Sequence, residues 1–333
     1  MRGETAQTSA RATALRCLRP VLDNLPALAT LLICSFLLLH SLPGSQADAL
    51  LTSDLGVAVT AEDHTRLQAR LGLDRPLWQQ FGSWLGGVLR GDLGYSRLYA
   101  APVAQVLADT LPWTLGLVLV ALPLSLLTGA LPGLLAGMAP QTGGAKYLFA
   151  LVTLLSSLPG FVIALLLLSL FGFTLGWFPT GGGISLEARL SGQVTLADLI
   201  YHALLPLLAL SLHGSVRYFY LAWGLAQQIS RRPFIRYARH RGIRGAGLLW
   251  RWYLPNAMPE LLSRLSSSLP GILGATLFVE VVFSYPGAGA LMLDAINNRD
   301  YPLLQGCLLL TGGIVLLGNS LLDLITTILT DRG

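Results

Sequence analysis

Charged side chains are scarce in this sequence. They make up 12% of its 333 residues, about half the share found in an ordinary soluble domain. Hydrophobic residues make up 53% of the chain, and the mean hydropathy is +0.62. So few charges cannot cover the water-facing surface of a protein of this length, which excludes an ordinary soluble domain. The long apolar runs instead predict a helical bundle embedded in a lipid bilayer.

Lysine is almost absent, because Lys146 is the one lysine in the chain. It follows Ala145 and precedes Tyr147. A P-loop requires Gly-Lys followed by Ser or Thr, in which backbone amides hold the phosphates and the lysine contacts the terminal ones. The chain therefore lacks a P-loop, and we expect any ATP hydrolysis that powers it to take place on a partner.

Other chemical signatures are also missing. Cys17, Cys34 and Cys307 show no C-x-x-C spacing, which argues against a disulfide framework or a zinc site. The absence of G-x-S-x-G gives little support to an intramembrane hydrolase. His202 and His213 could share a helix face, but without a third ligand in view we expect polar contacts between helices there. We therefore predict a non-catalytic protein with no metal and no cofactor of its own.

Six apolar segments reach the length of about 20 residues that a spanning helix needs. They are Leu22–Leu42, Leu111–Ala139, Tyr147–Trp177, Leu199–Ala226, Leu261–Phe283 and Leu303–Leu329. Several exceed the minimum, so tilted or kinked helices are expected. The candidate kinks are Pro123, Pro132, Pro159, Pro206 and Pro270. We predict an all-α, six-span transmembrane bundle that occupies residues 22–333.

Arginine is concentrated between the fourth and fifth segments. Eight arginines accompany one carboxylate, Glu260, between Gln227 and Arg264, which is typical of a cytoplasmic loop. The leader 1–21 carries four more, and we expect an uncleaved first span with a cytoplasmic N-terminus; a cleavable secretory signal is the alternative. Threading six spans from there places both chain ends in the cytoplasm. It makes 43–109 an outer subdomain and 227–260 a cytoplasmic loop.

Two carboxylates, Glu280 and Asp323, lie near the ends of the fifth and sixth segments. A charge inside a membrane costs about 2.5 to 3.5 kcal/mol on insertion scales, and ion-coupled carriers depend on such groups. Both positions are close enough to an interface for water to reach them. We therefore expect each carboxylate to have a structural or loop-anchoring role rather than to couple protons. A secondary carrier or channel that works without ATP remains the alternative.

The arginine loop reads F-I-R-Y-A-R-H-R-G-I-R-G-A-G-L-L-W-R-W-Y-L-P-N-A-M-P from Phe234 to Pro259. It resembles the cytoplasmic E-A-A-x-x-x-G segment of permease subunits in binding-protein-dependent ABC importers of the dipeptide, oligopeptide and nickel group. Arg236 and Tyr237 replace the first two residues of that signature. The positions that correspond to the signature and its downstream run, with the neighbouring arginine, are Arg236, Tyr237, Ala238, Arg239, Gly242, Pro255 and Asn256.

Stretches outside this loop resemble the same group. L-G-L-D-R-P-L-W-Q-Q-F and R-G-D-L-G-Y-S, within 71–96, are similar to its outer segment after the first span. F-P-T-G-G-G, at 178–183, is similar to its outer loop after the third span. E-V-V-F-S-Y-P-G-A-G-A-L and N-R-D-Y-P-L-L-Q-G, within 280–306, resemble its hallmark between the last two spans. The residues assigned to binding-protein docking by this resemblance are Asp74, Pro76, Gly91, Asp92, Tyr285, Pro286, Gly287, Gly289, Arg299, Asp300 and Tyr301.

The resemblance implies a permease subunit that forms a translocation pathway for peptides or a nickel-chelate type of solute in a bacterial inner membrane. Its expected partners are a second homologous permease, two cytoplasmic ATPase domains that bind the ATP, and an extracytoplasmic binding protein. The helix at Arg236–Gly242 would dock on an ATPase, with Gly242 allowing the close turn. A helix that lies on the lipid surface without a partner, burying Leu248, Leu249 and Trp252, is the alternative.

Overall fold

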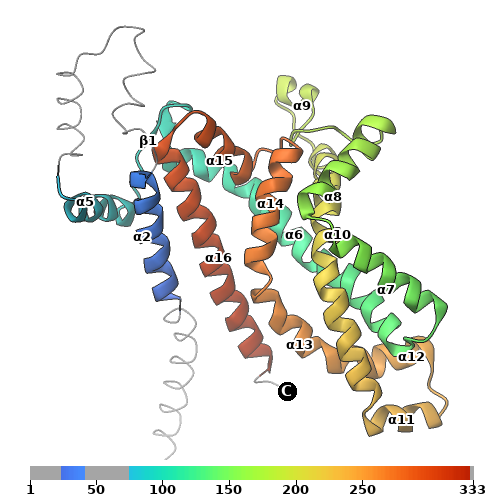
Figure 1. Cartoon of the computed structure of the whole chain (residues 1–333). Coiled ribbons are helices and arrows are strands. Elements are labelled where there is room, and N and C mark those ends of the chain that lie inside the picture. Colours follow the sequence, from blue (N-terminus) through green and yellow to red (C-terminus); the bar gives the residue numbers. More distant parts are fainter. Residues whose placement is uncertain (1–23, 42–74, 331–333) are drawn as a thin grey trace, which may run out of the picture. The chain divides into compact units, whose positions relative to one another are not determined.

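The computed structural model describes residues 24–41 and 75–330, and these residues are mainly helical (Figure 1). They belong to two compact units. The described part of the smaller unit is 24–41, 75–111 and 291–316, and that of the larger unit is 112–290 and 317–330. Helices α6 (Val103–Met138), α15 (Ala288–Asn297) and α16 (Tyr301–Thr330) contribute residues to both units.

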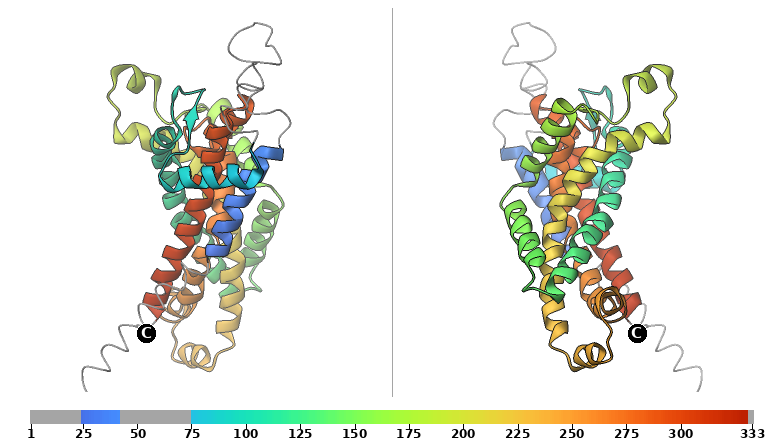
Figure 2. Two further views of the ribbon diagram at one scale, coloured as in Figure 1. Left: turned by 90° about the vertical axis from the view of Figure 1, so that its left-hand side faces the viewer. Right: turned by 90° about the vertical axis from the view of Figure 1, so that its right-hand side faces the viewer.

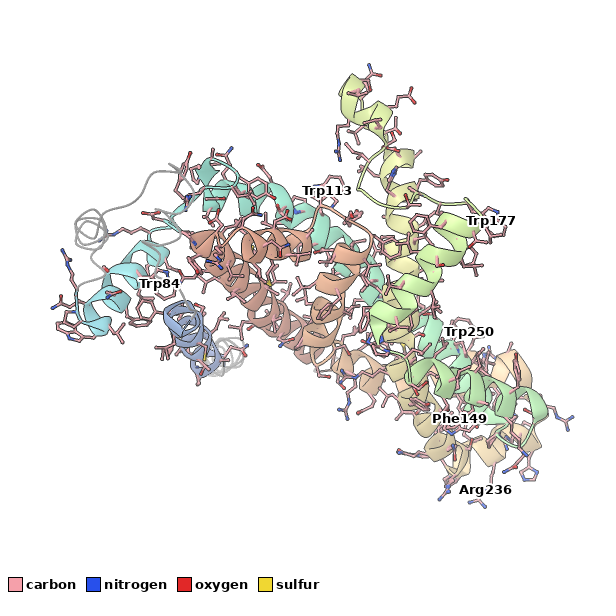
Figure 3. All side chains as sticks on the ribbon, turned by 45° about the horizontal axis from the view of Figure 1, so that its top comes forward. Trp84, Trp113, Phe149, Trp177, Arg236 and Trp250 are labelled. Carbon is pink, nitrogen blue, oxygen red and sulfur yellow. The ribbon has the colours of Figure 1, made fainter. Side chains whose placement is uncertain are left out.

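The smaller unit contains α2 (Leu25–Ser41), α5 (Leu77–Leu89) and a hairpin of β1 (Tyr95–Ser96) and β2 (Ala101–Pro102). The hairpin is antiparallel and pairs Tyr95 with Pro102. Aromatic rings join α5 to α2, since the ring of Phe36 lies 5.2 Å from that of Phe81 and 5.7 Å from that of Trp84. Trp84 is labelled in Figure 3. The first turns of α6 pack on α15 and α16 through a buried cluster: Val103, Val106, Leu107, Leu291, Ala295, Leu303, Leu304 and Cys307.

The larger unit continues α6 and adds the helices α7 (Gly143–Ser156), α8 (Gly160–Leu167), α9 (Leu186–Ser191), α10 (Leu196–Ser230), α11 (Pro233–His240), α12 (Gly245–Leu248), α13 (Leu254–Ser266) and α14 (Leu269–Val282). Two π-helical segments, η1 (Leu168–Thr174) and η2 (Leu249–Tyr253), extend α8 and join α12 to α13. Helix α10 is continuous over 35 residues, and α11 lies at the end of α10 that is opposite to α9 (Figures 1 and 2).

Each of the six predicted segments is mainly helical where the structure describes it, so the all-α prediction is confirmed. Helices α6 and α10 and the stretch Tyr301–Leu322 of α16 are each long and apolar enough to cross a membrane alone. The described helix of the first segment, α2, has 17 residues. Two further spans arise if each bent helix pair crosses as one. The count of six spans stays a prediction.

The third segment, Tyr147–Trp177, was predicted as one spanning helix with a candidate kink at Pro159. It is instead divided into two helices at that proline. Helices α7 and α8 meet at an angle of 101°, and α13 and α14 in the fifth segment meet at 62°. A proline lies at each break: Pro159 precedes α8 with an extended backbone (φ −58°, ψ 147°), and Pro270 lies in the first turn of α14. Proline lacks an N–H group, so it starts a helix more readily than it continues one.

Close contact between α6 and α10 holds the larger unit together. Gly129, Gly133 and Gly137 follow one another at four-residue spacing and therefore share a face of α6. A Cβ atom on Gly133 would lie 2.5 Å from the carbonyl oxygen of Phe219, and one on Gly137 would lie 2.7 Å from that of Trp223. Small residues at such a face let two membrane helices pack backbone against backbone.

We expect the substitution Gly133→Ala to lower the melting temperature of the detergent-solubilised protein. The added methyl group must push α10 away, and overpacking of this kind costs about 1 to 3 kcal/mol. Gly116→Ala is the matched control, because Gly116 lies on the same helix and a Cβ there meets no atom within 4 Å. Equal melting temperatures for the two variants would contradict the packing role of Gly133.

Candidate functional site

The basic loop between α10 and α13 begins with α11, which has a proline in its first turn. The helix ends at a left-handed residue, Gly242, with φ +79°. The N–H of Ile243 donates to the carbonyl of Ala238 (3.1 Å), and the N–H of Gly242 donates to that of Arg239 (3.0 Å). This pair of bonds is a Schellman cap. The left-handed backbone therefore favours glycine at position 242. The surrounding space does not, because a Cβ there would meet no neighbouring atom.

One face of α11 is buried inside the protein. The side chains of Ile235 and Ala238 are 0% exposed, and they join a core cluster with residues of α6, α10, α12, η2 and α13. The other members are Ala130, Leu134, Ala222, Ala226, Ile229, Leu248, Leu249, Tyr253, Ala257 and Leu261. Leu248 and Leu249 therefore pack in this core. The apolar face of the loop is occupied by the chain itself, which disfavours a helix held on a lipid surface.

The other face of α11 is basic and exposed. Arg236, Tyr237 and Arg241 lie on the surface, and the guanidinium of Arg241 is 5.8 Å from the centre of the Tyr237 ring. Figure 3 shows Arg236 at the tip of the loop. Arg239 is exposed as well, but its Nη2 also donates to the hydroxyl of Tyr253 (3.3 Å), which is 2.7 Å from Ser230 Oγ. The structure thus gives Arg239 an internal contact and leaves Arg236 on the outer face.

The downstream residues of the loop, Pro255 and Asn256, lie in the first turn of α13 and are exposed. The side-chain amide of Asn256 donates to the carbonyl of Trp252 at 2.6 Å. That carbonyl belongs to the π-helical segment η2. Asn256 therefore stabilises the join between η2 and α13.

A second candidate site lies where α14 ends, because Glu280 in the last turn of that helix is 0% exposed and bonds the loop that follows. Its Oε1 accepts a hydrogen bond from the hydroxyl of Thr114 (2.7 Å), and its Oε2 accepts one from the N–H of Gly289 (2.6 Å). Thr114 Oγ1 accepts in turn from the N–H of Ala288 (2.8 Å). Glu280 therefore anchors the loop, as predicted. The expectation that water reaches its carboxylate is wrong, because the loop folds back over it.

Two glycines make room for this network. A Cβ on Gly287 would overlap the carboxylate of Glu280, and one on Gly289 would overlap the carbonyl of Leu277. The loop also receives the segment 178–183, since the N–H of Gly182 donates to the carbonyl of Phe283 (2.9 Å). The ring of Tyr285 is buried, 5.6 Å from that of Trp113. Motifs that are about 100 residues apart in sequence thus form one loop assembly.

In the smaller unit, Asp300 connects the motif stretch 298–306, to which it belongs, with the motif stretch 90–96. Its Oδ2 accepts from the hydroxyl of Ser96 (2.7 Å) and from the N–H of Leu98 (3.1 Å). Its Oδ1 accepts from the N–H of Leu303 (3.2 Å) in the first turn of α16, which is the geometry of a helix N-cap. Asp300 is 3% exposed, so its carboxylate shapes the loop and is not presented to a partner.

A second contact closes the same loop. The hydroxyl of Tyr99 donates to the carboxylate of Asp294 at 3.1 Å. Partial burial and this bond raise the pKa of Tyr99 to about 12. The phenol is protonated at neutral pH, as an ordinary tyrosine is, and donates this bond.

The docking residues predicted from the sequence divide by exposure. Tyr285, Gly287, Gly289, Asp300 and Tyr301 are buried and determine the shape of the loops, whereas those on the surface are Pro76, Gly91, Asp92, Pro286 and Arg299. Asp74 lies outside the described residues, as does the side chain of Asp323.

Sequence reasoning missed the partners of the two buried carboxylates, Thr114 and Ser96. Each is one hydroxyl among many in the sequence, and each is separated from its carboxylate by more than 160 residues. No spacing rule connects residues that are so far apart. Only the packed structure identifies them.

The two histidines do not form a metal site. His202 Nδ1 lies 3.0 Å from the carbonyl and 3.3 Å from the carboxylate of Asp198, one turn earlier in the same helix. The predicted contact between helices is therefore wrong for His202. Within the described residues no three His, Cys, Asp or Glu side chains come together as a metal site would require.

Comparison with known proteins places the chain in a transport family. Residues 129–332 match the family model of the binding-protein-dependent transport system inner membrane component. The chain belongs to this family. It is thus a membrane component of a transport system, a permease, and not an enzyme, which makes the hydrolase interpretation wrong. The matched residues include the basic loop, the Glu280 loop and the Asp300 loop.

Relatives of this permease match it over nearly its full length. A putative peptide permease protein of Brucella ovis is 32% identical over 95% of this chain and 98% of its own. The oligopeptide transport system permease protein AppB of Bacillus subtilis is 28% identical over 95% and 98%. A probable peptide ABC transporter permease protein of Sinorhizobium fredii is 31% identical over 95% and 97%. These matches confirm the resemblance noted from the sequence.

We expect Glu280→Ala to loosen the loop that follows α14 in this permease. The N–H of Gly289 and the hydroxyl of Thr114 would lose their acceptor inside the protein, and each buried donor without a partner costs about 1 to 3 kcal/mol. Thermal unfolding and protease cleavage between 284 and 288, both in detergent, measure the effect. Glu260→Ala is the control, because Glu260 makes an exposed pair with Arg264 (3.3 Å), and such pairs contribute little. Equal losses in both variants would contradict the anchoring role.

Proposed function

We propose that this permease forms, with a second homologous permease, the pathway of an ATP-driven peptide importer in a bacterial inner membrane. Two cytoplasmic ATPase domains would bind the ATP, and an extracytoplasmic binding protein would deliver the peptide. The peptide class rests on the names of the relatives, since all three described above are peptide or oligopeptide permeases. The dependence on a binding protein in the family description disfavours a carrier that works without ATP.

One observation carries the coupling role of α11. Its apolar face is fully buried in a core shared with α6, α10 and α13, while its arginines are exposed. A helix held in this way moves as one body with the helices that it packs on, because protein cores are close-packed and transmit displacement. In this proposal an ATPase contacts the outer face around Arg236, and closure of the two ATPases shifts α10 and α13 together.

In this proposal the loops held by Glu280 and Asp300 contact the binding protein, whereas α11 contacts the ATPase. Glu280 and Asp300 hold their loops from inside, so the loops are preorganised before a binding protein arrives. Arg299 is exposed and has a left-handed backbone with φ +51°, a conformation that costs a non-glycine residue about 1 to 2 kcal/mol. Strain of this kind is found where function requires a particular side chain. We assign Arg299 to docking of the binding protein, with both chain ends in the cytoplasm.

We expect Gly242→Val to uncouple ATP hydrolysis from uptake. A β-branched residue cannot adopt φ +79° without strain, so the end of α11 must unwind and its contact with the ATPase is lost. The measurement is peptide uptake and ATP hydrolysis by the reconstituted complex. Gly242→Asn is the matched control, because asparagine tolerates the left-handed conformation. Normal uptake by the valine variant, once it is inserted in the membrane, would overturn the assignment.

Arg299→Gly is expected to leave the melting temperature unchanged or raised, because glycine removes the backbone strain. The same change should lower the stimulation of ATP hydrolysis by the loaded binding protein, because the docking charge is gone. Arg299→Asn removes the charge but keeps a residue suited to the left-handed backbone, and should behave in the same way. Full stimulation in both variants would remove Arg299 from the docking surface.

A further inference from the structure

A single charge lies in the long apolar stretch of α10. Residues 199–230 contain no Asp, Glu or Lys and one arginine, Arg217. With 1.5 Å of rise per residue, Arg217 lies about 20 Å from the end of α10 at Ser230. Ionisable groups inside membrane helices are costly and usually face a cavity or a partner. Within the described part of the chain, Arg217 has no carboxylate partner, so its charge requires another explanation.

Arg217 borders a cavity of about 170 Å³ in the larger unit. The walls come from α6, α10, α14 and the bend before α14, and the polar residues that line them are Ser125, His213, Arg217, Tyr218 and Ser268. The cavity opens at the surface, because His213 and Arg217 are exposed. Its volume corresponds to about five or six water molecules at roughly 30 Å³ each, which is enough room for a small polar group.

The polar groups at this cavity offer hydrogen-bond donors. Arg217 Nη1 donates to the carbonyl of Ser267 (3.2 Å), and Nη2 donates to the hydroxyl of the same residue (3.1 Å). A guanidinium carries five N–H donors and no acceptor, so three remain. Tyr218 is 2% exposed, and its hydroxyl lies near Ser268 without a hydrogen bond of standard geometry in the described structure. A buried phenol hydroxyl without a partner lowers the stability of the protein unless a ligand accepts its hydrogen bond.

We propose that this cavity binds the terminal carboxylate of a peptide during its passage, with Arg217 and Tyr218 as donors. The inference rests on the peptide importer function proposed above. A carboxylate has two oxygens in one plane, which suits the planar guanidinium fork, and it accepts hydrogen bonds without donating any. Binding there would give Tyr218 its missing acceptor. It would also pair the one charge of the span.

The bond from Arg217 to Ser267 supports this placement. Ser267 caps the end of α13, where the chain bends by 62° into α14. Arg217 therefore connects the cavity to the bend that separates the core around α11 from the outer half of the unit. A purely structural arginine that caps this bend is the competing explanation, and the two differ in what they predict for Tyr218. Its hydroxyl contributes nothing to such a cap.

The test compares uptake of a tripeptide acid with uptake of the same tripeptide carrying a C-terminal amide. Both are assayed with the complete reconstituted complex, including its binding protein. For each complex we divide the uptake of the acid by the uptake of the amide. The measured quantity is this acid-to-amide ratio for the wild-type permease, divided by the same ratio for a variant. Any preference of the binding protein itself cancels, because it is common to both complexes. The variants are Arg217→Gln, Arg217→Lys and Tyr218→Phe, with Tyr220→Phe as control for the loss of a phenol.

We expect Arg217→Gln to reduce the preference for the acid by about tenfold to a hundredfold, as loss of a charge-assisted hydrogen bond does. Arg217→Lys should restore it in part, since lysine keeps the charge but not the fork. Tyr218→Phe should also reduce the preference while leaving the melting temperature unchanged or raised, because it removes a buried hydroxyl without a partner. This test stands even if Arg217→Gln does not fold. Tyr220→Phe should leave the preference intact, because its hydroxyl bonds Thr153 at 3.0 Å and is not among the cavity walls.

Two results would overturn the proposal, and they are distinguishable. Uptake of the tripeptide by wild type with an unchanged acid-to-amide ratio in both the Arg217→Gln and Tyr218→Phe complexes would leave the importer function standing and remove the carboxylate site. Failure of the wild-type complex to take up peptide in either form would overturn the peptide function itself and the site with it.

Discussion

The close approach of α6 and α10 is the contact on which the other features of the larger unit depend. Lipid tails are as apolar as leucine, so helices in a membrane gain little from hydrophobic burial and must associate by close packing. The three glycines of α6 provide this packing. They bring Ala222 and Ala226 of α10 into the cluster that holds Ile235 and Ala238 of α11. The same pair of helices approaches closely at the cavity, where a Cβ on Gly214 would overlap Ser125.

The loops opposite α11 and those of the smaller unit are stabilised by a different interaction. Glu280 and Asp300 are buried acids whose oxygens accept hydrogen bonds from backbone N–H groups and hydroxyls. Such bonds are strong where water is excluded, and they leave no buried acceptor without a donor. Each carboxylate binds a segment distant in sequence and so holds irregular backbone in one conformation. The exposed residues of these loops are thereby presented on a rigid support.

Four described helix ends have the same cap, with three different residue types at its left-handed position. The ends of α5, α11, α14 and α15 each have the paired hydrogen bonds of a Schellman cap, and the left-handed residue is Gly91, Gly242, Ser284 and Arg299 respectively. Glycine satisfies this conformation without strain, whereas serine and arginine do not. Glycine after a helix is therefore a useful signal in a sequence, but its absence does not exclude the cap. Gly242 allowed the end of α11 to be predicted from the sequence, whereas Ser284 and Arg299 gave no such signal for the ends of α14 and α15.

Composition and local chemistry were sufficient to predict an all-helical membrane protein, a basic loop with a turn at Gly242, and the absence of a P-loop, because these depend on residue types and short spacings. Local chemistry also marked five prolines but could not say which of them bend the chain. Pro123, Pro132 and Pro206 lie within continuous helices, and the breaks occur near Pro159 and Pro270. A helix that is packed on its neighbours retains its direction despite one missing hydrogen bond. Only the tertiary structure decided which carboxylates are buried, which hydroxyls meet them and which arginine faces a cavity, because these contacts join residues whose separation along the chain carries no periodic signal.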